Sequence, residues 1–315
     1  MARFTTDNWD LACARREMLE ESLQQDDRAV AEEIGFAVHY LVRFGYLPYK
    51  IKEDHDIPVE TLKAGLKDFQ RVYGLSQDGV VGSKTIRAME QPRCGIPDKL
   101  DKNNPDHKHA IKMMRLAKAS KKKWQKDGLH YYVKSYVRDI PEAVQDDIFE
   151  GAWDAWDIVC GLRIMRTTSA RDADLVVDTG EGRRSNFDGQ GGVLAWAYMP
   201  QGKEMQLRMK FDLGETWVDQ PNKRGVLLFN VACHEFGHML GLEHSDREDA
   251  LMAPHYNPCI DTPQWDDIEK IQRLYGKNGL AKQMMRGEPK RFSVVCTDLQ
   301  VQGFSLTPDG GGEHR

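Results

Sequence analysis

Residues 234–244 read His-Glu-Phe-Gly-His-Met-Leu-Gly-Leu-Glu-His, and this stretch decides how the rest of the chain is interpreted. His234 and His238 are four residues apart, so on a helix their rings project from one face and can bind one ion. Gly241 can end that helix in a backbone conformation that other residues avoid, and the turn lets His244 return as a third ligand. Three neutral imidazoles leave a fourth position open, which is the arrangement of a catalytic zinc site.

Glu235 directly follows the first histidine and is the predicted catalytic base. Zinc in such a site supplies a nucleophilic water at neutral pH and polarises a carbonyl group. Glu235 is placed to take the proton of that water and pass it to a leaving amine. A surface helix with chance histidines is the weaker interpretation, because five fixed positions match. The motif therefore predicts a zinc-dependent enzyme that hydrolyses peptide bonds.

Composition sets the limits within which this enzyme must fold. The chain has 315 residues, 40% of them hydrophobic, which suggests one large or two modest domains. Its net charge of -5 lacks the basic excess expected of a nucleic-acid-binding protein. No apolar stretch reaches the roughly 18 residues of a membrane span, and no signal peptide is visible in residues 1–10. The spacing of the 6 cysteines assigns no disulfide.

Hydrophobic periodicity divides the chain into two domains with flanking segments. An all-α domain over 29–98 is expected from helical patterns at 29–44, 59–73 and 83–89. A second domain over 124–279 mixes helices and strands, so its fold class is α+β. Its expected helices and strands are these: helices at 141–159, 224–240 and 265–275; strands at 129–137, 162–165, 173–177, 193–199 and 205–211. A polar segment (1–28), a basic linker (99–123) and a C-terminal tail (280–315) complete the chain.

Two further motifs give the chain a family resemblance. Met252 lies eight residues after His244 and resembles the methionine turn of the metzincins, whose Met packs beneath the zinc ligands. Residues 92–98, Pro-Arg-Cys-Gly-Ile-Pro-Asp, resemble the cysteine switch of the matrix metalloproteinase (matrixin) family of zinc endopeptidases. The resemblance covers most of residues 30–279. It implies that the Cys94 thiolate fills the fourth zinc position, while Arg93 and Asp98 pair to brace the loop.

The resemblance also implies a domain architecture, a mode of activation and a class of substrate. It implies a collagenase-like metzincin domain with a twisted mixed sheet and three helices, preceded by a peptidoglycan-binding-like propeptide. It further implies an extracellular, monomeric zymogen that a protease activates and that cleaves proteins, including those of extracellular-matrix type. Two alternatives stay open. One is a cell-wall peptidase or wall-binding protein guided by the helical domain, and the other is a non-enzymatic binding protein with a relict site.

A glycine-rich segment resembles the calcium loop of this family. Residues 187–193 read Phe-Asp-Gly-Gln-Gly-Gly-Val, and the acidic residues Asp212 and Glu215 follow later in the chain. Calcium prefers many oxygen ligands. The implied ligands are three carboxylates and three carbonyl groups: Asp188, Asp212 and Glu215, with Gly189, Gly191 and Val193. The plainer alternative is an ordinary glycine turn beside surface acids.

The chain departs from the family at the second, structural zinc. Trp196 and Lys210 stand at places where the family usually has histidines, and neither suits zinc. One zinc is therefore expected instead of two. The resemblance also places the substrate pocket: Pro254 and Tyr256 on its outer wall and Asn230 at its floor. An apolar side chain after the scissile bond is the expected preference.

Overall fold

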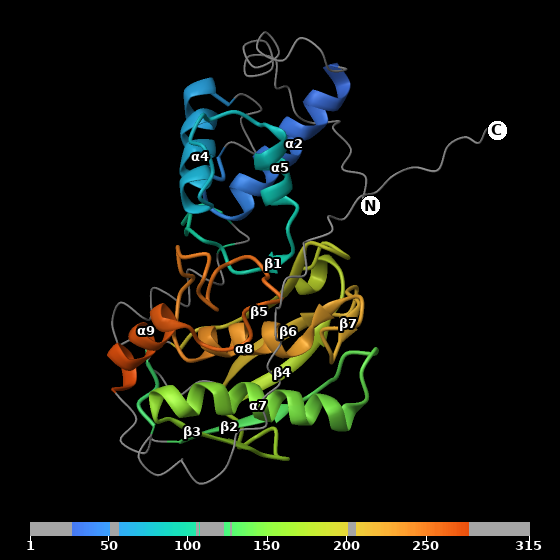
Figure 1. Ribbon diagram of the computed structural model, residues 1–315, viewed down its shortest axis with the longest axis vertical. Coiled ribbons are helices and arrows are strands. Elements are labelled where there is room, and N and C mark those ends of the chain that lie inside the picture. Colours follow the sequence, from blue (N-terminus) through green and yellow to red (C-terminus); the bar gives the residue numbers. More distant parts are fainter. Residues whose placement is uncertain are drawn as a thin grey trace, which may run out of the picture.

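The computed structural model describes residues 27–50, 57–104, 107, 123–126, 128–200 and 206–276. Most of the predicted N-terminal segment, most of the basic linker and the whole C-terminal tail lie outside these residues. A small helical domain sits on a larger domain that contains a sheet and three helices (Figure 1). No helix in the described ranges combines the length and the apolarity needed to cross a membrane.

The helical domain contains α2 (Asp27–Arg43), α4 (Val59–Val72) and α5 (Ser83–Met89). These bounds agree with the predicted helices to within two residues at each end. Apolar residues recur every three or four positions, so each helix turns one face inward. Ile34, Leu41, Leu62, Leu66 and Phe69 are at most 1% exposed and form the centre of this domain.

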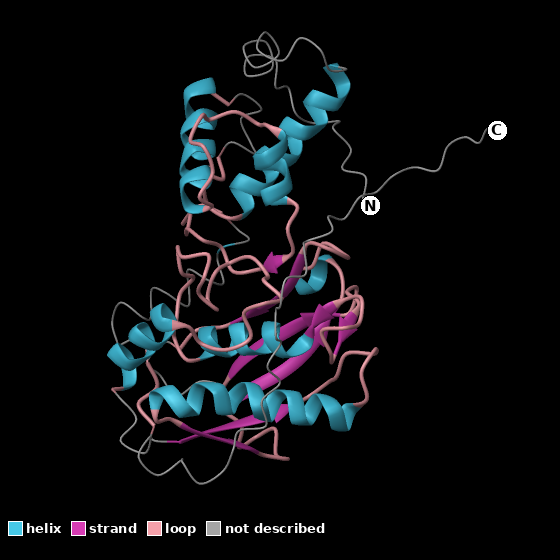
Figure 2. Ribbon diagram, viewed as in Figure 1, coloured by secondary structure: helices cyan, strands magenta, loops and turns pink. Residues whose placement is uncertain are grey.

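The larger domain is built on a six-stranded sheet in the order β1-β5-β6-β4-β2-β3. The β5–β6 pair is antiparallel and the other four pairs are parallel, so the predicted mixed sheet, drawn as magenta strands in Figure 2, is confirmed. The strand bounds are Arg93–Cys94 for β1, Gly128–Val133 for β2, Arg163–Arg166 for β3, Leu175–Gly180 for β4, Val193–Ala197 for β5 and Leu207–Asp212 for β6. The sequence did not predict β1, nor the small parallel pair of β7 (Trp217–Val218) and β8 (Val226–Leu227).

Three helices complete this domain: α7 (Glu142–Cys160), α8 (Leu228–Met239) and α9 (Trp265–Tyr275). A short 3-10 turn, η2, covers Arg183–Ser185. The bounds of α9 match the prediction, whereas α8 begins later than expected because residues 226–227 form β8. The Trp153 and Phe236 rings stack at 3.7 Å between α7 and α8. The Trp156 indole also donates to the carbonyl of Cys233, at 2.8 Å. These contacts fix the zinc-motif helix against the core.

The two domains share a packed boundary. Strand β1 follows α5 in the chain but pairs in parallel with β5 of the larger domain (Figure 1). The apolar core of the helical domain also continues onto Phe187, Val193 and Trp196 of the larger domain. The helical domain is therefore docked through both backbone and apolar contacts.

Candidate metal centre

Four side chains converge at the carboxyl end of α8. His234 and His238 extend from the helix, and the chain then turns at Gly241, whose φ is 105°. This turn carries His244 back, so its ring centroid lies 4.9 Å from that of His238 and 5.5 Å from that of His234. The Cys94 Sγ lies 3.5 Å from His238 Nε2. One ligand atom from each of these four residues lies within 4.8 Å of all the others.

The hydrogen bonds of the imidazoles show how the rings are oriented. His234 Nδ1 contacts the Leu251 carbonyl and His238 Nδ1 contacts the Leu242 carbonyl, both at 2.7 Å. His244 Nδ1 contacts Asp98 Oδ1 at 2.9 Å. Because these oxygens only accept hydrogen bonds, each Nδ1 carries the proton and each Nε2 keeps a free lone pair. Each ring therefore presents a ligand atom to the centre.

Burial prepares these imidazoles to bind a metal. Desolvation lowers the pKa of His234 to about 3 and also lowers the pKa values of His238 and His244, so all three rings are neutral. The Nε2 atoms of His234 and His244 are buried without a hydrogen-bond partner among the described residues. Unpaired buried acceptors are costly, and a metal ion would satisfy them. Three nitrogens and one sulfur fit tetrahedral zinc.

Glu235 is completely buried beside these ligands. Neither carboxylate oxygen has a hydrogen-bond partner among the described residues. Burial raises the pKa of Glu235 to about 8, although the neighbouring Cys94 thiol acts in the opposite direction. A carboxyl group with a pKa near neutrality can both accept and return a proton.

The segment that carries Cys94 lies in the groove beside α8. The Cys94 amide donates to the Pro254 carbonyl at 2.9 Å, and the Gly95 amide donates to Ala195 at 2.8 Å. A Cβ atom at position 95 would lie 2.6 Å from Val193 Cγ1, so only glycine fits this close approach. The segment is thus held between β5 and the 254–256 loop.

Arg93 and Asp98 form a buried pair next to the metal centre. Arg93 Nη2 lies 2.6 Å from Asp98 Oδ1, and both side chains are less than a tenth exposed. Burial opposes ionisation of Asp98, but Arg93 and His244 overcome it and lower the pKa of this carboxyl below its usual range. Since Asp98 also contacts His244, it orients a candidate metal ligand in addition to pairing with Arg93.

Met252 lies beneath the zinc-motif helix. Its side chain is completely buried. A Cβ atom at Gly237 would lie 2.4 Å from Met252 Sδ, so the sulfur packs directly against the helix between His234 and His238. The Asp267 carboxylate accepts the Met252 amide at 3.1 Å and the Leu251 amide at 2.8 Å. The turn is therefore fixed from below by α9.

The structure brings together the three carboxylates that were predicted to bind calcium. One oxygen of each accepts a hydrogen bond from a backbone amide. Asp188 Oδ1 accepts the Val193 amide, Asp212 Oδ1 accepts the Gly214 amide, and Glu215 Oε1 accepts the Gly191 amide. Burial, with Asp212 and Asp188 nearby, raises the pKa of Glu215 to about 7, although the Gly191 amide opposes this. Gly189 and Gly191 both have positive φ, at 97° and 87°. The loop thus gathers negative charge at one place.

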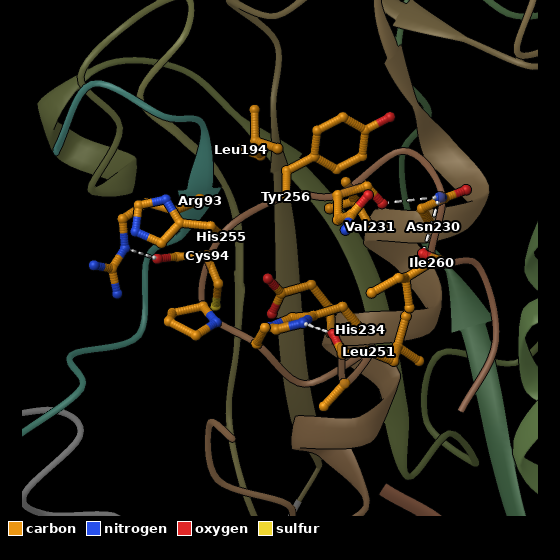
Figure 3. Close-up of a pocket in the computed structure, with 15 residues that line it drawn as sticks. Arg93, Cys94, Leu194, Asn230, Val231, His234, Leu251, His255, Tyr256 and Ile260 are labelled. Atoms are coloured by element: carbon orange, nitrogen blue, oxygen red, sulfur yellow. Dashed lines mark hydrogen bonds between the residues drawn. The ribbon is translucent and has the colours of Figure 1, made fainter. Parts of the chain in front are cut away.

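The predicted substrate pocket is small. A cavity of about 30 Å³ opens beside His234 and Glu235 and is lined by Leu194, Asn230, Tyr256 and Ile260 among others (Figure 3). The Asn230 side-chain amide donates to the carbonyls of Ile260 at 3.0 Å and Pro258 at 3.1 Å. The Tyr256 hydroxyl accepts the Leu227 amide at 3.0 Å. Asn230 therefore holds the 257–260 loop against the floor of the cavity.

Trp196 and Lys210 face each other in neighbouring strands. The Trp196 indole donates to the Ser185 carbonyl at 2.7 Å, and Lys210 Nζ lies 3.4 Å from Ser185 Oγ. Both side chains thus hold the 183–185 turn directly. The 183–185 turn is therefore held by hydrogen bonds from these two side chains to Ser185.

Sequence reasoning missed several residues that surround the switch. The hydroxyls of Tyr40 and Tyr73 lie 2.6 Å and 3.1 Å from Arg93 Nη1. The Tyr73 ring also packs at 4.4 Å against His255, a half-buried histidine whose two ring nitrogens are buried. Neither tyrosine lies in a recognisable motif, and a hydroxyl does not reveal a distant partner from the sequence. Arg43 was missed because its partner, Asp188, is also distant in the sequence.

A histidine pair on one helical face, a third histidine after a glycine turn, a buried glutamate and a methionine beneath them define the class of metzincin-type metal centres. The sequence model of the matrixin family matches residues 123–276, and that of a peptidoglycan-binding domain matches residues 31–89. The chain therefore belongs to the matrixin family, and the predicted family is confirmed.

Individual relatives agree with this assignment. The chain is 34% identical over 255 residues to matrix metalloproteinase-16 of Homo sapiens, covering 75% of this chain and 40% of that protein. It is 36% identical over 233 residues to the interstitial collagenase of Equus caballus, covering 71% and 45%. It is 34% identical over 251 residues to the neutrophil collagenase of Homo sapiens, covering 75% and 49%. The chain thus spans about half the length of the curated relatives that it matches.

Proposed function

We propose that the protein is a zinc-dependent metalloendopeptidase made as an inactive precursor. The main observation that supports this proposal is that three neutral imidazoles and the Cys94 thiol converge on one point beside the buried Glu235. The three histidines would hold zinc, and Cys94 would occupy the fourth position until the helical domain is displaced. The family model and the relatives support this function.

The chain's own residues account for the remaining chemistry. Zinc, when bound, supplies a nucleophilic water and polarises the scissile carbonyl. Glu235 takes the proton of the attacking water and returns it to the amine of the leaving peptide. Strand β5 has a free edge once β1 leaves it, and an extended peptide can pair with that edge through its backbone. The Pro254–Tyr256 loop then forms the opposite wall.

The substrate class follows from the same groove. A site that binds extended backbone between β5 and the 254–256 loop suits peptide segments of proteins. We propose protein substrates, including those of the extracellular matrix, and an extracellular place of action. Two of the relatives carry the name collagenase, which is consistent with this proposal.

The helical domain is assigned the role of an inhibitory propeptide. Its core continues onto Phe187, Val193 and Trp196, so the docked face is buried and committed to the catalytic domain. Removal of the chain up to a cut between 98 and 124 by an activating protease would release it, leaving a monomeric enzyme. Retention of the full chain on insoluble peptidoglycan would instead favour the cell-wall alternative.

The proposal is tested by an assay of the trimmed protein on quenched peptides. We expect hydrolysis that stops when a chelator removes zinc and returns when zinc is restored. The rate of hydrolysis should be compared between peptides taken from protein sequences and peptides that copy the cross-bridges of peptidoglycan. A trimmed protein that contains zinc but cleaves neither would contradict the enzymatic function and favour a relict site.

The metal content gives a second prediction. We expect one zinc per chain, since Trp196 and Lys210 stand where a second site would need histidines. Calcium is proposed to bind Asp188, Asp212 and Glu215, with carbonyls of Gly189, Gly191 and Val193. Elemental analysis of the purified full chain measures both. Two equivalents of zinc would contradict the first expectation.

Pocket size gives a prediction about specificity. With Arg93 and Cys94 of the docked segment lining it, this cavity measures only about 30 Å³, so we propose that it takes a small apolar side chain after the scissile bond in preference to leucine or phenylalanine. Asn230→Ala should release the 257–260 loop and shift the preference toward larger side chains, as measured with a peptide library. Thr262→Ala is the matched control, because the exposed Thr262 hydroxyl donates to Asp261 and the residue does not line the cavity. A wild-type preference for large side chains would contradict this interpretation.

A further inference from the structure

An ion pair links the helical domain to the proposed calcium loop. Arg43, the last residue of α2, lies with Nη1 2.5 Å from Asp188 Oδ2. Its Nη2 also donates to the Asn186 carbonyl at 3.3 Å. Asp188 belongs to the catalytic domain, so this ion pair joins the two domains away from the cysteine switch.

The other carboxylates of the loop show what that oxygen would otherwise do. As described above, the backbone ties one oxygen of each acid. Asp212 is only 1% exposed, and its second oxygen is buried without a hydrogen-bond partner among the described residues. A buried, unpaired carboxylate oxygen beside other acids indicates a place for a cation. The corresponding oxygen of Asp188 is the one that Arg43 contacts.

We propose that Arg43 and a calcium ion compete for Asp188, so that calcium binding weakens the docking of the helical domain. The inference rests on the proposed function, in which that domain is the inhibitor. Asp188 Oδ2 satisfies the guanidinium in the docked state and would complete the calcium ligand set in the released state. By thermodynamic linkage, whatever weakens the Arg43 contact must strengthen calcium binding, and the converse also holds.

The expected coupling is modest. The side chains of Arg43 and Asp188 are 25% and 31% exposed, so solvent screens their attraction. Allosteric couplings commonly change an affinity by about 5- to 150-fold. We expect a value near the lower end of that range, about fivefold.

Calcium affinity of the full chain is the first measurement. The Glu235→Ala background prevents self-cleavage, and calcium is titrated calorimetrically into protein exchanged into calcium-free buffer. Arg43→Ala and Arg43→Gln should each bind calcium about fivefold more tightly than the background chain. Arg71→Ala is the matched control, since Arg71 pairs with Asp68 within the helical domain at 3.0 Å. Equal affinities in the Arg43 and Arg71 variants, or no calcium binding, would overturn the proposal.

Release of the switch is the reciprocal measurement. The rate at which a maleimide labels Cys94 is followed by mass spectrometry of the peptide that contains this residue. Calcium should accelerate labelling in the Arg71→Ala control and have little effect in Arg43→Gln, where the competition is already lost. Labelling that is insensitive to calcium in the control would refute the coupling. Neither readout needs peptide hydrolysis, so a failure of the proposed enzymatic function would be seen separately.

Discussion

Glu235→Ala in the activated protein is expected to retain zinc and to lose peptide hydrolysis by at least about 10³-fold in kcat/KM. Among the described residues none forms a hydrogen bond with the Glu235 carboxylate, whose buried oxygens lie beside the proposed metal ligands. Its removal therefore takes away the proton acceptor without disturbing the imidazoles, whose Nδ1 atoms are fixed by Leu251, Leu242 and Asp98.

Two companion variants separate chemistry from structure. Glu235→Gln keeps the shape of the side chain but cannot accept the proton, so it should be nearly as inactive as Glu235→Ala. Glu150→Ala removes an exposed glutamate of α7 and should leave both activity and zinc content unchanged. Normal hydrolysis by zinc-loaded Glu235→Ala would refute the assignment of the base.

The regular elements were predictable because their signals are local. Helices α2, α4 and α9 follow apolar repeats of three and four residues, and the bounds of α9 match the prediction. Strand β1 was invisible because it has two residues and exists only through its pairing with β5, about 100 positions away. A pattern read along the chain carries no information on such a partner.

The site shows the same division between local and distant signals. Three histidines and Glu235 fall within 11 residues, so a single helix and turn determine their arrangement. The contact of Asp98 with His244 spans 146 positions, and that of Arg43 with Asp188 spans 145. These pairs depend on how the helical domain docks, and charge alone does not reveal a partner. The sequence resemblance named Asp98 as a brace for Arg93 but missed its second role at His244.

Cys94→Ser is expected to make the full-length chain active without trimming. Cys94 Sγ lies 3.5 Å from His238 Nε2, at the point where a thiolate would complete tetrahedral coordination. A serine hydroxyl is a much poorer zinc ligand because it stays protonated near neutral pH. Each weakening of the docking of the helical domain by about 1.4 kcal/mol raises the fraction of undocked chains tenfold. We therefore expect Cys94→Ser to be at least about tenfold more active than the untrimmed wild-type chain.

The gain should stop short of full activation because the remaining contacts still hold the helical domain. Arg93 keeps its pair with Asp98, and the apolar contacts of Phe187 and Trp196 do not involve sulfur. Trimming of Cys94→Ser should therefore raise its activity further. Cys160→Ser is the control, since this buried thiol on α7 is free but lies outside the metal-ligand cluster. Activity is measured at early times on a quenched peptide, with the chain length checked by mass. An inactive, zinc-loaded Cys94→Ser chain would show that the groove is closed by the docked backbone of residues 92–95 instead of by the thiol.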